Sequence, residues 1–405
     1  MIFSRVFEVF SSPQWLSIYL KENLGASDEN IGLVNATQSG VNVLLQPLGG
    51  VVGQRFSKKK LYLVSLVIQA SAFLIAFLAV DWTWAVLMSI VLGCHALAYP
   101  GISALIGEIT DRATRATVFA FEATVISIVV MLRGPLQGFI AESAGLRPLY
   151  LLGVVGAMVS FFMFWKFFPD VKVEEDKSER LSETESSESL KQQVRQVFAR
   201  PDYRRNFIGL IQAGMLWRLF VLGFYPFVDI YLYEELGWSF IFFGLYARLY
   251  GFFSSFLITA LKIPFGKIID KYHLRRIAYF GGPASEGVMF LCMVFLRDPY
   301  HLAAIFLMQS VFEGIHTLAV GALWYDAFPL KVYSIGSAIR GVMYGSSAML
   351  GSLLGAHLWA NLGSTSAFYI AGTAQIAAAF IALILIRDIK DEEQVHSGEE
   401  DTDED

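Results

Sequence analysis

Seven residues with side chains that can bind ions or protons lie in segments of this chain that are otherwise apolar. An arginine guanidinium binds a carboxylate or phosphate through paired hydrogen bonds, and an imidazole exchanges a proton near neutral pH. A glutamate can neutralise either group, and an indole N–H donates a hydrogen bond. The set therefore indicates binding of an anionic or hydrogen-bonding group, with a proton as a second ligand. The candidates are Arg5, Glu8, His95, Trp217, Arg218, Glu313 and His316.

The two arginines stand at matching places in the two halves of the chain. Arg5 lies 14 residues before Tyr19, and Arg218 lies 13 residues before Tyr231. At about 1.5 Å per helical residue, both fall about 20 Å from the same end of their segments. We expect each guanidinium to face a cavity and an anionic partner. An ion pair between Arg5 and Glu8, one helical turn apart, is the alternative.

The two histidines also match, each in the middle of an apolar segment. Gly93-Cys-His95-Ala-Leu resembles Gly314-Ile-His316-Thr-Leu, so we expect equivalent positions. Either histidine could couple ligand movement to a proton. The alternatives are that each histidine bonds a neighbouring helix without titrating, and that Glu313 and His316 form a structural pair. We also expect Glu286 and Arg248 to pair between helices, and Gln38 and Asn42 to line the cavity.

The elements that position these residues must be membrane helices. Hydrophobic residues make up 55% of the 405 residues, charged residues only 17%, and the mean hydropathy is +0.52. A membrane core of about 30 Å needs about 20 apolar helical residues, and residues 61–80 form such a run. The chain is predicted to be an all-α polytopic membrane protein with twelve transmembrane helices. The expected spans are 1–20, 31–53, 61–80, 84–107, 116–141, 147–168, 206–232, 240–265, 276–296, 301–325, 333–360 and 365–386.

A polar segment divides these spans into two sets of six. Residues 1–168 are predicted to form one bundle and residues 206–388 a second. Residues 169–205 are expected to be a cytoplasmic linker with a helix on the membrane surface, and residues 389–405 an acidic cytoplasmic tail. Short loops after even-numbered spans hold eleven Lys and Arg, and those after odd-numbered spans hold three. Both termini are therefore predicted to lie in the cytoplasm, with the protein in the cell membrane.

A repeat relates the two halves. YLKENLGASDENIGL at 19–33 and YLYEELGWSFIFFGL at 231–245 share eight of fifteen residues at a constant offset of 212. Gly134-x-x-x-Gly138 likewise matches Gly351-x-x-x-Gly355. Since both copies have the same orientation, the two bundles should be parallel repeats about an axis along the membrane normal. The repeat partner of the start of span 206–232 would precede Met1, so the first helix is expected to be short or the true start earlier.

The architecture and one short loop in each half resemble the major facilitator superfamily. The family loop motif is roughly G-x-x-x-D-[RK]-x-G-[RK]-[RK]. The first copy here begins GVVGQRF at residue 50, with Gln54 in place of the acid, and the second begins GKIIDKY at residue 266. The resemblance implies alternating access about a substrate site near the middle of the membrane. It also implies a cytoplasmic gate, here Gly50, Gln54, Arg55, Glu108, Arg115, Gly266, Asp270, Lys271 and Asp326.

A second motif bears on the direction of transport. Gly134, Pro135 and Gly138 resemble the end of the G-x-x-x-G-P-x-x-G-G motif of the family's drug–proton antiporters, although Val130 and Phe139 replace two of its glycines. This favours export slightly.

The leading hypothesis is a proton-coupled secondary transporter of a small organic solute. An organic-anion uptake or exchange carrier is the alternative, because organophosphate antiporters of this family also place arginines on helices one and seven. A non-transporting membrane receptor or sensor is the alternative from another class. We expect no enzymatic activity, cofactor, metal or nucleic acid. The expected partners are a small-molecule substrate, a proton or other coupling ion and the lipid bilayer, and the protein is expected to be a monomer.

Overall fold

In the computed structural model, the residues described are 6–8, 13, 15–55, 57–97, 115–168, 201–244, 265, 268–269, 271–327 and 333–387. Side chains are described in these ranges except at 47, 49–55, 58, 115–124, 127, 131, 201–203, 325–327 and 333–338. Every regular element within these ranges is a helix, which confirms the predicted all-α class.

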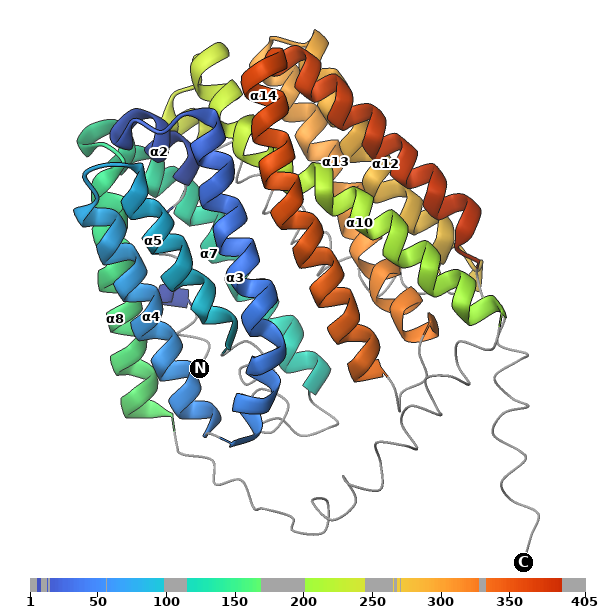
Figure 1. The fold of residues 1–405 in the computed structure, drawn as a ribbon, viewed down its shortest axis with the longest axis horizontal. Helices are drawn as coiled ribbons and strands as arrows, with labels where there is room; N and C mark the ends of the chain where they lie inside the picture. The colour runs from blue at the N-terminus through green and yellow to red at the C-terminus, as the bar shows by residue number, and fades with distance from the viewer. Residues whose placement is uncertain are drawn as a thin grey trace, which may run out of the picture.

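The helices up to residue 168 pack together as one group (Figure 1). α4 packs against both α5 and α8, α3 against α5, and α7 against α8. The elements of this group are α2 (Leu16–Leu24), α3 (Asp28–Arg55), α4 (Lys58–Leu78), α5 (Trp82–Gly93), the 3₁₀ turn η1 (Cys94–Leu97), α7 (Arg115–Ala144) and α8 (Arg147–Phe167).

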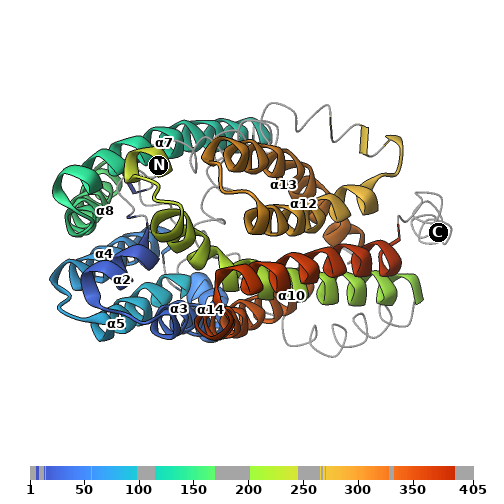
Figure 2. The same ribbon diagram turned by 90° about the horizontal axis from the view of Figure 1, so that it is seen from above.

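The helices from residue 201 onward form a second group beside the first. α14 packs against α10 and α12, and α13 packs against α12. The two groups meet where α14 lies along α3 (Figure 2). The elements here are α10 (Pro201–Ile230), the π-helical turn η2 (Tyr231–Glu235), α12 (Arg275–Phe295), α13 (Pro299–Ala327) and α14 (Tyr333–Leu385).

Six helices in the described ranges are long and apolar enough to cross a membrane. One of them, Ile339–Leu385, has 47 residues, which at about 1.5 Å each is roughly twice what a membrane of about 30 Å requires. Gly363 breaks this helix with a φ of 75°, where the sequence predicts the boundary between spans 333–360 and 365–386. Predicted spans 84–107 and 240–265 fall partly outside the described residues, so the count of twelve stays a prediction.

The predicted span 1–20 is not one continuous helix. Residues 6–8 are helical, Pro13 and Trp15 are not, and α2 begins only at Leu16. Trp15 has a left-handed φ of 58°, a conformation that cannot continue a right-handed helix. Its indole instead packs against the rings of Phe240 and Phe243, at centroid distances of 5.4 and 5.8 Å.

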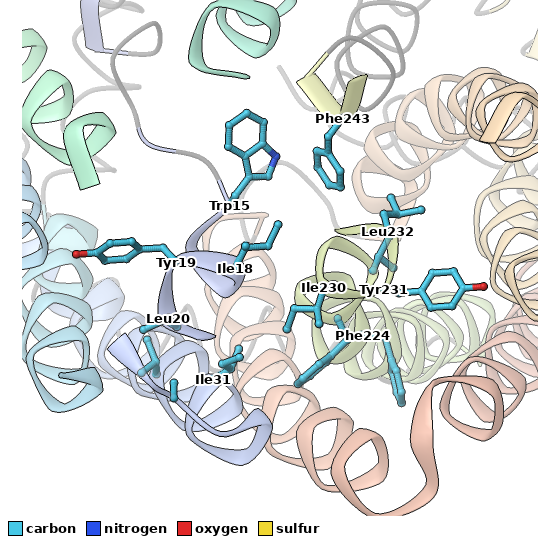
Figure 3. Close-up of a cluster of buried hydrophobic side chains, with 14 of the residues drawn as sticks. Trp15, Ile18, Tyr19, Leu20, Ile31, Phe224, Ile230, Tyr231, Leu232 and Phe243 are labelled. Atoms are coloured by element: carbon cyan, nitrogen blue, oxygen red, sulfur yellow. The ribbon is translucent and has the colours of Figure 1, made fainter. Parts of the chain in front are cut away.

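The sequence repeat is a repeat of structure, beginning with its tyrosines. The Tyr19 hydroxyl donates a hydrogen bond to the Ala76 carbonyl of α4, at 2.7 Å. The Tyr231 hydroxyl donates equivalently to the Met293 carbonyl of α12, at 2.8 Å. In Figure 3 the two rings point away from each other, each into its own group of helices. Both tyrosines are buried, so these hydrogen bonds satisfy hydroxyls that water cannot reach.

The turns that follow the tyrosines are also equivalent. Gly25 and Gly237 have left-handed φ values of 64° and 65°, which a glycine adopts without strain. The residue after each glycine donates its N–H back to a leucine carbonyl, at 2.9 and 3.0 Å. Ser27 Oγ then accepts the N–H of Asn30 at 3.2 Å, and Ser239 Oγ accepts that of Phe242 at 3.2 Å, so each serine caps the next helix.

The last described identity of the repeat lies where the two groups touch. A Cβ built on Gly244 would overlap the carbonyl of Gly134 in α7. A Cβ built on Gly32, its repeat partner in α3, would overlap the Ala356 side chain and come within 2.6 Å of the Ser352 carbonyl in α14. Both positions therefore need glycine for the helices of the two groups to pack this closely.

Loops 25–27, 79–81, 145–146, 236–239 and 296–298 and the break at Gly363 mark one end of the molecule, called the outer end below after the charge-based prediction (Figure 1). Contacts between the two groups close this end. Lys21 Nζ lies 2.9 Å from Glu234 Oε2 of the other group and 3.1 Å from Asp28 Oδ1. The Phe240 N–H donates to Glu142 Oε2 at 3.0 Å.

We expect Lys21→Met to loosen this closure modestly. Burial lowers the pKa of Lys21, but the Glu234 and Asp28 carboxylates outweigh it and raise the pKa above the ordinary 10.5. The stabilisation is therefore complete below pH 10.5 and is lost as the pH rises through the higher folded-state value. A partly exposed pair contributes up to about 1 kcal/mol, so the ratio of closed to open molecules should fall by about fivefold at most.

The measurement is the distance distribution between spin labels at Asn23 and Thr365, both exposed at the outer end on opposite groups. Arg297→Met is the control, because Arg297 pairs with Glu235 inside one group, at 3.6 Å. Identical distributions for Lys21→Met and the control at neutral pH would show that the lysine does not hold the end closed.

Candidate functional site

Two adjoining chambers lie between the helix groups. The inner chamber, of about 540 Å³, is lined by side chains of α3, α10, α12, α13 and α14. The outer chamber, of about 500 Å³, extends from it to α2 at the outer end. Ser39, Asn42 and Leu222 line both chambers, so the two chambers adjoin each other. Gln38 lies on the outer chamber, as the sequence predicts for a cavity residue.

Arg218 of α10 is the main cation of the inner chamber. Its guanidinium carbon lies 5.0 Å from the Trp217 ring centroid and 5.7 Å from that of Tyr344, distances at which a cation is attracted to an aromatic face. Its buried Nε has no hydrogen-bond partner among the described residues, and no ion pair to Arg218 occurs within them. Because the aromatic faces leave N–H donors unused, the guanidinium can still bind an acceptor.

Glu313 and His316 of α13 face the same chamber, one helical turn apart. His316 Nδ1 lies 2.8 Å from the Tyr279 carbonyl, which can only accept, so Nδ1 carries a proton, and in the neutral imidazole Nε2 has the lone pair. His316 Nε2 and Glu313 Oε2 are both buried without a hydrogen-bond partner among the described residues. The chamber therefore offers two unused acceptors beside an unused donor.

Arg340 of α14 adds a second guanidinium to the lining. Its guanidinium carbon lies 5.1 Å from the Trp324 ring centroid. The sequence marks Arg340 only as an ionisable residue in an apolar segment and does not place it beside Arg218. The packing of α10 against α14 is what brings both arginines to one space.

Two predicted cavity residues, Arg5 and Glu8, are not among the described residues that line the chambers. Glu8 is buried and accepts a hydrogen bond from the Tyr62 hydroxyl at 2.9 Å, and it lines neither chamber. Arg5, its predicted partner, lies outside the described residues.

The two histidines lie in different local structure. His316 stands inside α13, whereas α5 ends at Gly93 and His95 lies in the 3₁₀ turn η1. His95 lines neither chamber. The equivalence of the two histidines stays a prediction.

Trp217 and Glu286 meet in a way that the sequence does not predict. Trp217 lines the inner chamber, and its Nε1–H donates to Glu286 Oε2 of α12 at 2.5 Å. Gln309 Nε2 donates to Glu286 Oε1 at 3.3 Å. The predicted partner, Arg248, lies outside the described residues.

The predicted cytoplasmic gate is described only in part. Gly50, Gln54 and Arg55 lie in the last turns of α3, Arg115 is the first residue of α7, and Asp326 lies at the end of α13. Lys271 is exposed, with Nζ 5.3 Å from the Tyr272 ring centroid. Glu108, Gly266 and Asp270 lie outside the described residues, so the gate stays a prediction.

Gly134 and Gly138, the glycines of the motif in predicted span 116–141, lie in α7 and face the second group of helices. The Gly134 carbonyl lies against Gly244, and a Cβ on Gly138 would come within 2.5 Å of the Phe240 carbonyl. Pro135 stands between them inside the helix. The matching Gly351 and Gly355 instead pack on the backbone of α10, within their own group. The two copies of the motif thus make different contacts.

No group of three or more His, Cys, Asp or Glu that could hold a metal ion occurs among the residues described. The helix groups and the polar chambers between them define the class: a polytopic helical membrane protein with a polar cavity between two groups of helices. The family model described as "Major Facilitator Superfamily" matches residues 1–261 and 223–404. The chain belongs to the major facilitator superfamily of membrane transporters.

Curated relatives match over part of their length. An uncharacterized MFS-type transporter of Bacillus subtilis, YqjV, is 30% identical over 169 residues, which is 41% of this chain and 40% of that protein. The quinolone resistance protein NorA of Staphylococcus aureus is 29% identical over 152 residues, 36% of this chain and 38% of NorA. These alignments thus span about two fifths of each relative.

Solved transporters share the fold over nearly the whole chain. The nucleoside transporter NupG superimposes with a TM-score of 0.72 at 13% identity, covering 95% of this chain and 96% of NupG. A peptide transporter POT in complex with alafosfalin also gives 0.72 at 13% identity, covering 95% and 92%. At this identity the likeness concerns the fold alone.

Proposed function

We propose that this protein is a secondary active transporter that moves a small organic solute by alternating access, is driven by protons and works in the direction of export. The observation that carries the proposal is the inner chamber, where Arg218 and Glu313 hold polar groups without partners among the described residues. Charged groups inside a membrane normally face a ligand, a cavity or one another. An unoccupied donor and acceptor between two movable helix groups suit a ligand that binds and leaves.

The direction and the driving ion rest on weaker support. The similarity to the quinolone resistance protein NorA and the glycine motif of α7 both favour export of a drug-like compound. The outer chamber adds amides and apolar side chains, such as Asn35, Gln38 and Met289, so the cavity suits a solute with a polar and an apolar part. Proton coupling fits the glutamates and the histidine around Arg218.

Uptake or exchange of an organic anion is the second candidate. Its support is that two guanidinium groups, those of Arg218 and Arg340, line the inner chamber. Guanidinium pairs with carboxylate or phosphate through two parallel hydrogen bonds.

The test is flux in proteoliposomes under an imposed pH gradient. Candidate solutes come from a thermal-shift screen of the purified protein against anions, sugars, amino acids and lipophilic cations. Proton-driven export predicts accumulation of the hit solute against its own gradient when the protons flow the opposite way. Exchange without a pH response supports the anion carrier, and binding without any flux supports a receptor or sensor and overturns the proposal.

The division of the chain and its orientation are part of the proposal. We propose two bundles, at 1–168 and 206–388, which correspond to the two helix groups. Residues 169–205 would be the linker between them and residues 389–405 the tail. Both termini in the cytoplasm suit the eleven-to-three distribution of basic residues between loops. Labelling of single cysteines at Asn23 and Thr365 by an impermeant reagent from outside the cell tests the orientation.

We expect the two loop motifs to contribute unequally to the cytoplasmic gate. Gln54 replaces the acid of the first loop motif, whereas Asp270 keeps the acid of the second. A charge-assisted hydrogen bond contributes about 1.5–3 kcal/mol, and only the second loop can make one through this position. Asp270→Asn should therefore reduce transport more than Gln54→Ala does, as measured by initial flux in proteoliposomes. Equal losses, or the reverse order, would contradict the prediction.

A further inference from the structure

Glu286 of α12 is a buried carboxyl group that lies outside both chambers, behind the wall of the inner one. The residue is only 3% exposed. Its two described hydrogen bonds come from the Trp217 indole and the Gln309 amide, which are neutral donors. No ion pair to Glu286 occurs within the described part of the chain. A carboxylate in such a place is costly without a cation, and a bound proton removes the charge.

The charged and titratable groups around Glu286 come from every helix packed against it. Arg218 of α10 and Glu313 of α13 act on it electrostatically. His316 of α13 lies against Trp217, with ring centroids 5.2 Å apart. Tyr279 lies on α12 itself, and Arg340 and Tyr344 of α14 line the chamber beyond Trp217. α14 also contributes the neutral side chain of Gln375, which donates a hydrogen bond to the Trp217 carbonyl at 3.1 Å.

The amide oxygen of Gln309, beside Glu286, is an acceptor that could bind a proton carried by Glu286. The buried Oε1 of Gln309 has no hydrogen-bond partner among the described residues. With Glu286 ionised, the Gln309 amide nitrogen donates to it, as observed. With Glu286 protonated, rotation of the Gln309 amide by half a turn would let Oε1 accept the new carboxyl proton. The pair can thus satisfy both states of Glu286.

Trp217 connects this carboxyl group to the cavity. Its N–H is held by Glu286, while its ring faces Arg218 and His316 in the inner chamber. Protonation of Glu286 weakens the charge-assisted bond to the indole. The ring, and the guanidinium that lies against it, are then less firmly held.

We propose that Glu286 is a reversible proton-binding site of the transporter, linked to the ligand cavity through the hydrogen bond with Trp217. A proton taken from water binds a carboxylate oxygen of Glu286, and its release restores the carboxylate, so only hydrogen bonds change. The inference rests on the proposed proton coupling and assigns the proton to Glu286, which lines neither chamber, instead of to Glu313 or His316, which line the inner one. Glu313 would then remain free to contact the ligand.

The first test needs no transport. Infrared difference spectra of the detergent-purified protein between acid and alkaline pH report the carbonyl stretch of any carboxyl group that takes up a proton. Glu286→Gln keeps an acceptor for the Trp217 indole but cannot titrate, so one band should disappear. Glu313→Gln should keep that band, as should Glu22→Gln, which removes an exposed carboxyl at the outer end. A spectrum of Glu286→Gln identical to the parent overturns the proposal.

A second variant covers the case in which Glu286→Gln does not fold. Trp217→Phe keeps the carboxyl group and removes the indole donor, so the pH midpoint of the same band should move. An unchanged midpoint overturns the link between Glu286 and Trp217.

The transport assay then gives an independent answer. Solute counterflow in proteoliposomes should depend on pH in the parent protein and lose that dependence in Glu286→Gln. Loss of the dependence in His316→Gln, with retention in Glu286→Gln, assigns the proton to the histidine and overturns the proposal. Absence of flux in every protein would refute the proposed function, whereas the infrared band would still decide whether Glu286 binds a proton.

Discussion

Arg218→Lys is expected to weaken ligand binding by about 10- to 150-fold and to reduce transport to a comparable extent, because the lost hydrogen bonds to a charged group contribute about 1.5–3 kcal/mol. The Arg218 guanidinium carbon lies near the Trp217 and Tyr344 rings, at 5.0 and 5.7 Å from their centroids, and its buried Nε has no hydrogen-bond partner among the described residues. An ammonium keeps the charge but loses the planar fork and its stacking. The substitution therefore tests the contribution of the guanidinium geometry while the positive charge is kept.

The measurement is the affinity for the solute identified in the thermal-shift screen, followed by flux at saturating concentration. Arg297→Lys is the matched control, because the Arg297 side chain is 57% exposed at the outer end and lines neither chamber. A lysine variant of Arg218 that binds and transports like the parent would remove Arg218 from the ligand site. It would also remove the main support for an anionic or hydrogen-bonding substrate.

The second large effect is expected at the contact between the helix groups. Gly244→Ala places a Cβ against the Gly134 carbonyl and 2.7 Å from its carbon, where backbone atoms cannot give way independently. Overpacking of this kind costs about 1–3 kcal/mol, and here it must separate α7 from residues 240–244. Gly32→Ala should act in the same direction on α3 and α14. Both variants should lower the melting temperature and lengthen the Asn23–Thr365 spin-label distance.

Gly321→Ala is the control, since an added Cβ there meets nothing within 4 Å. Alanine favours a helix over glycine by about 1 kcal/mol, so this control should be neutral or stabilising. Opposite signs for Gly244→Ala and Gly321→Ala would show that contact between the groups, and not helix propensity, sets the effect. Equal effects would indicate that the close approach of the two backbones contributes little.

Much of the repeat could be predicted from sequence because its interactions are local. The positive φ of Gly25 and Gly237 and the caps formed by Ser27 and Ser239 involve residues within six positions of one another. Such hydrogen bonds depend on residue type and spacing, so equal sequences give equal turns. Membrane class followed from hydropathy for a similar reason, since backbone polar groups in lipid must bond within a helix.

The candidate site was predictable only in part. Arg218, Glu313 and His316 stood out as ionisable residues in apolar segments, and all three line the inner chamber. Glu8 and His95 stood out for the same reason and line neither chamber. Hydropathy indicates that an ionisable group in an apolar segment needs either a partner or a cavity, but it does not predict which of the two the group has.

The sequence by itself determined the helical membrane class, the internal repeat, the family resemblance and the chemical types available to the site. Only the tertiary structure decided which of those residues meet. Glu286 binds Trp217 across 69 positions of the chain, and equivalent glycine motifs contact different helices in the two halves. The physical reason is that a helix fixes the spacing of its own side chains, whereas its rotation and distance relative to other helices depend on packing summed over all their contacts.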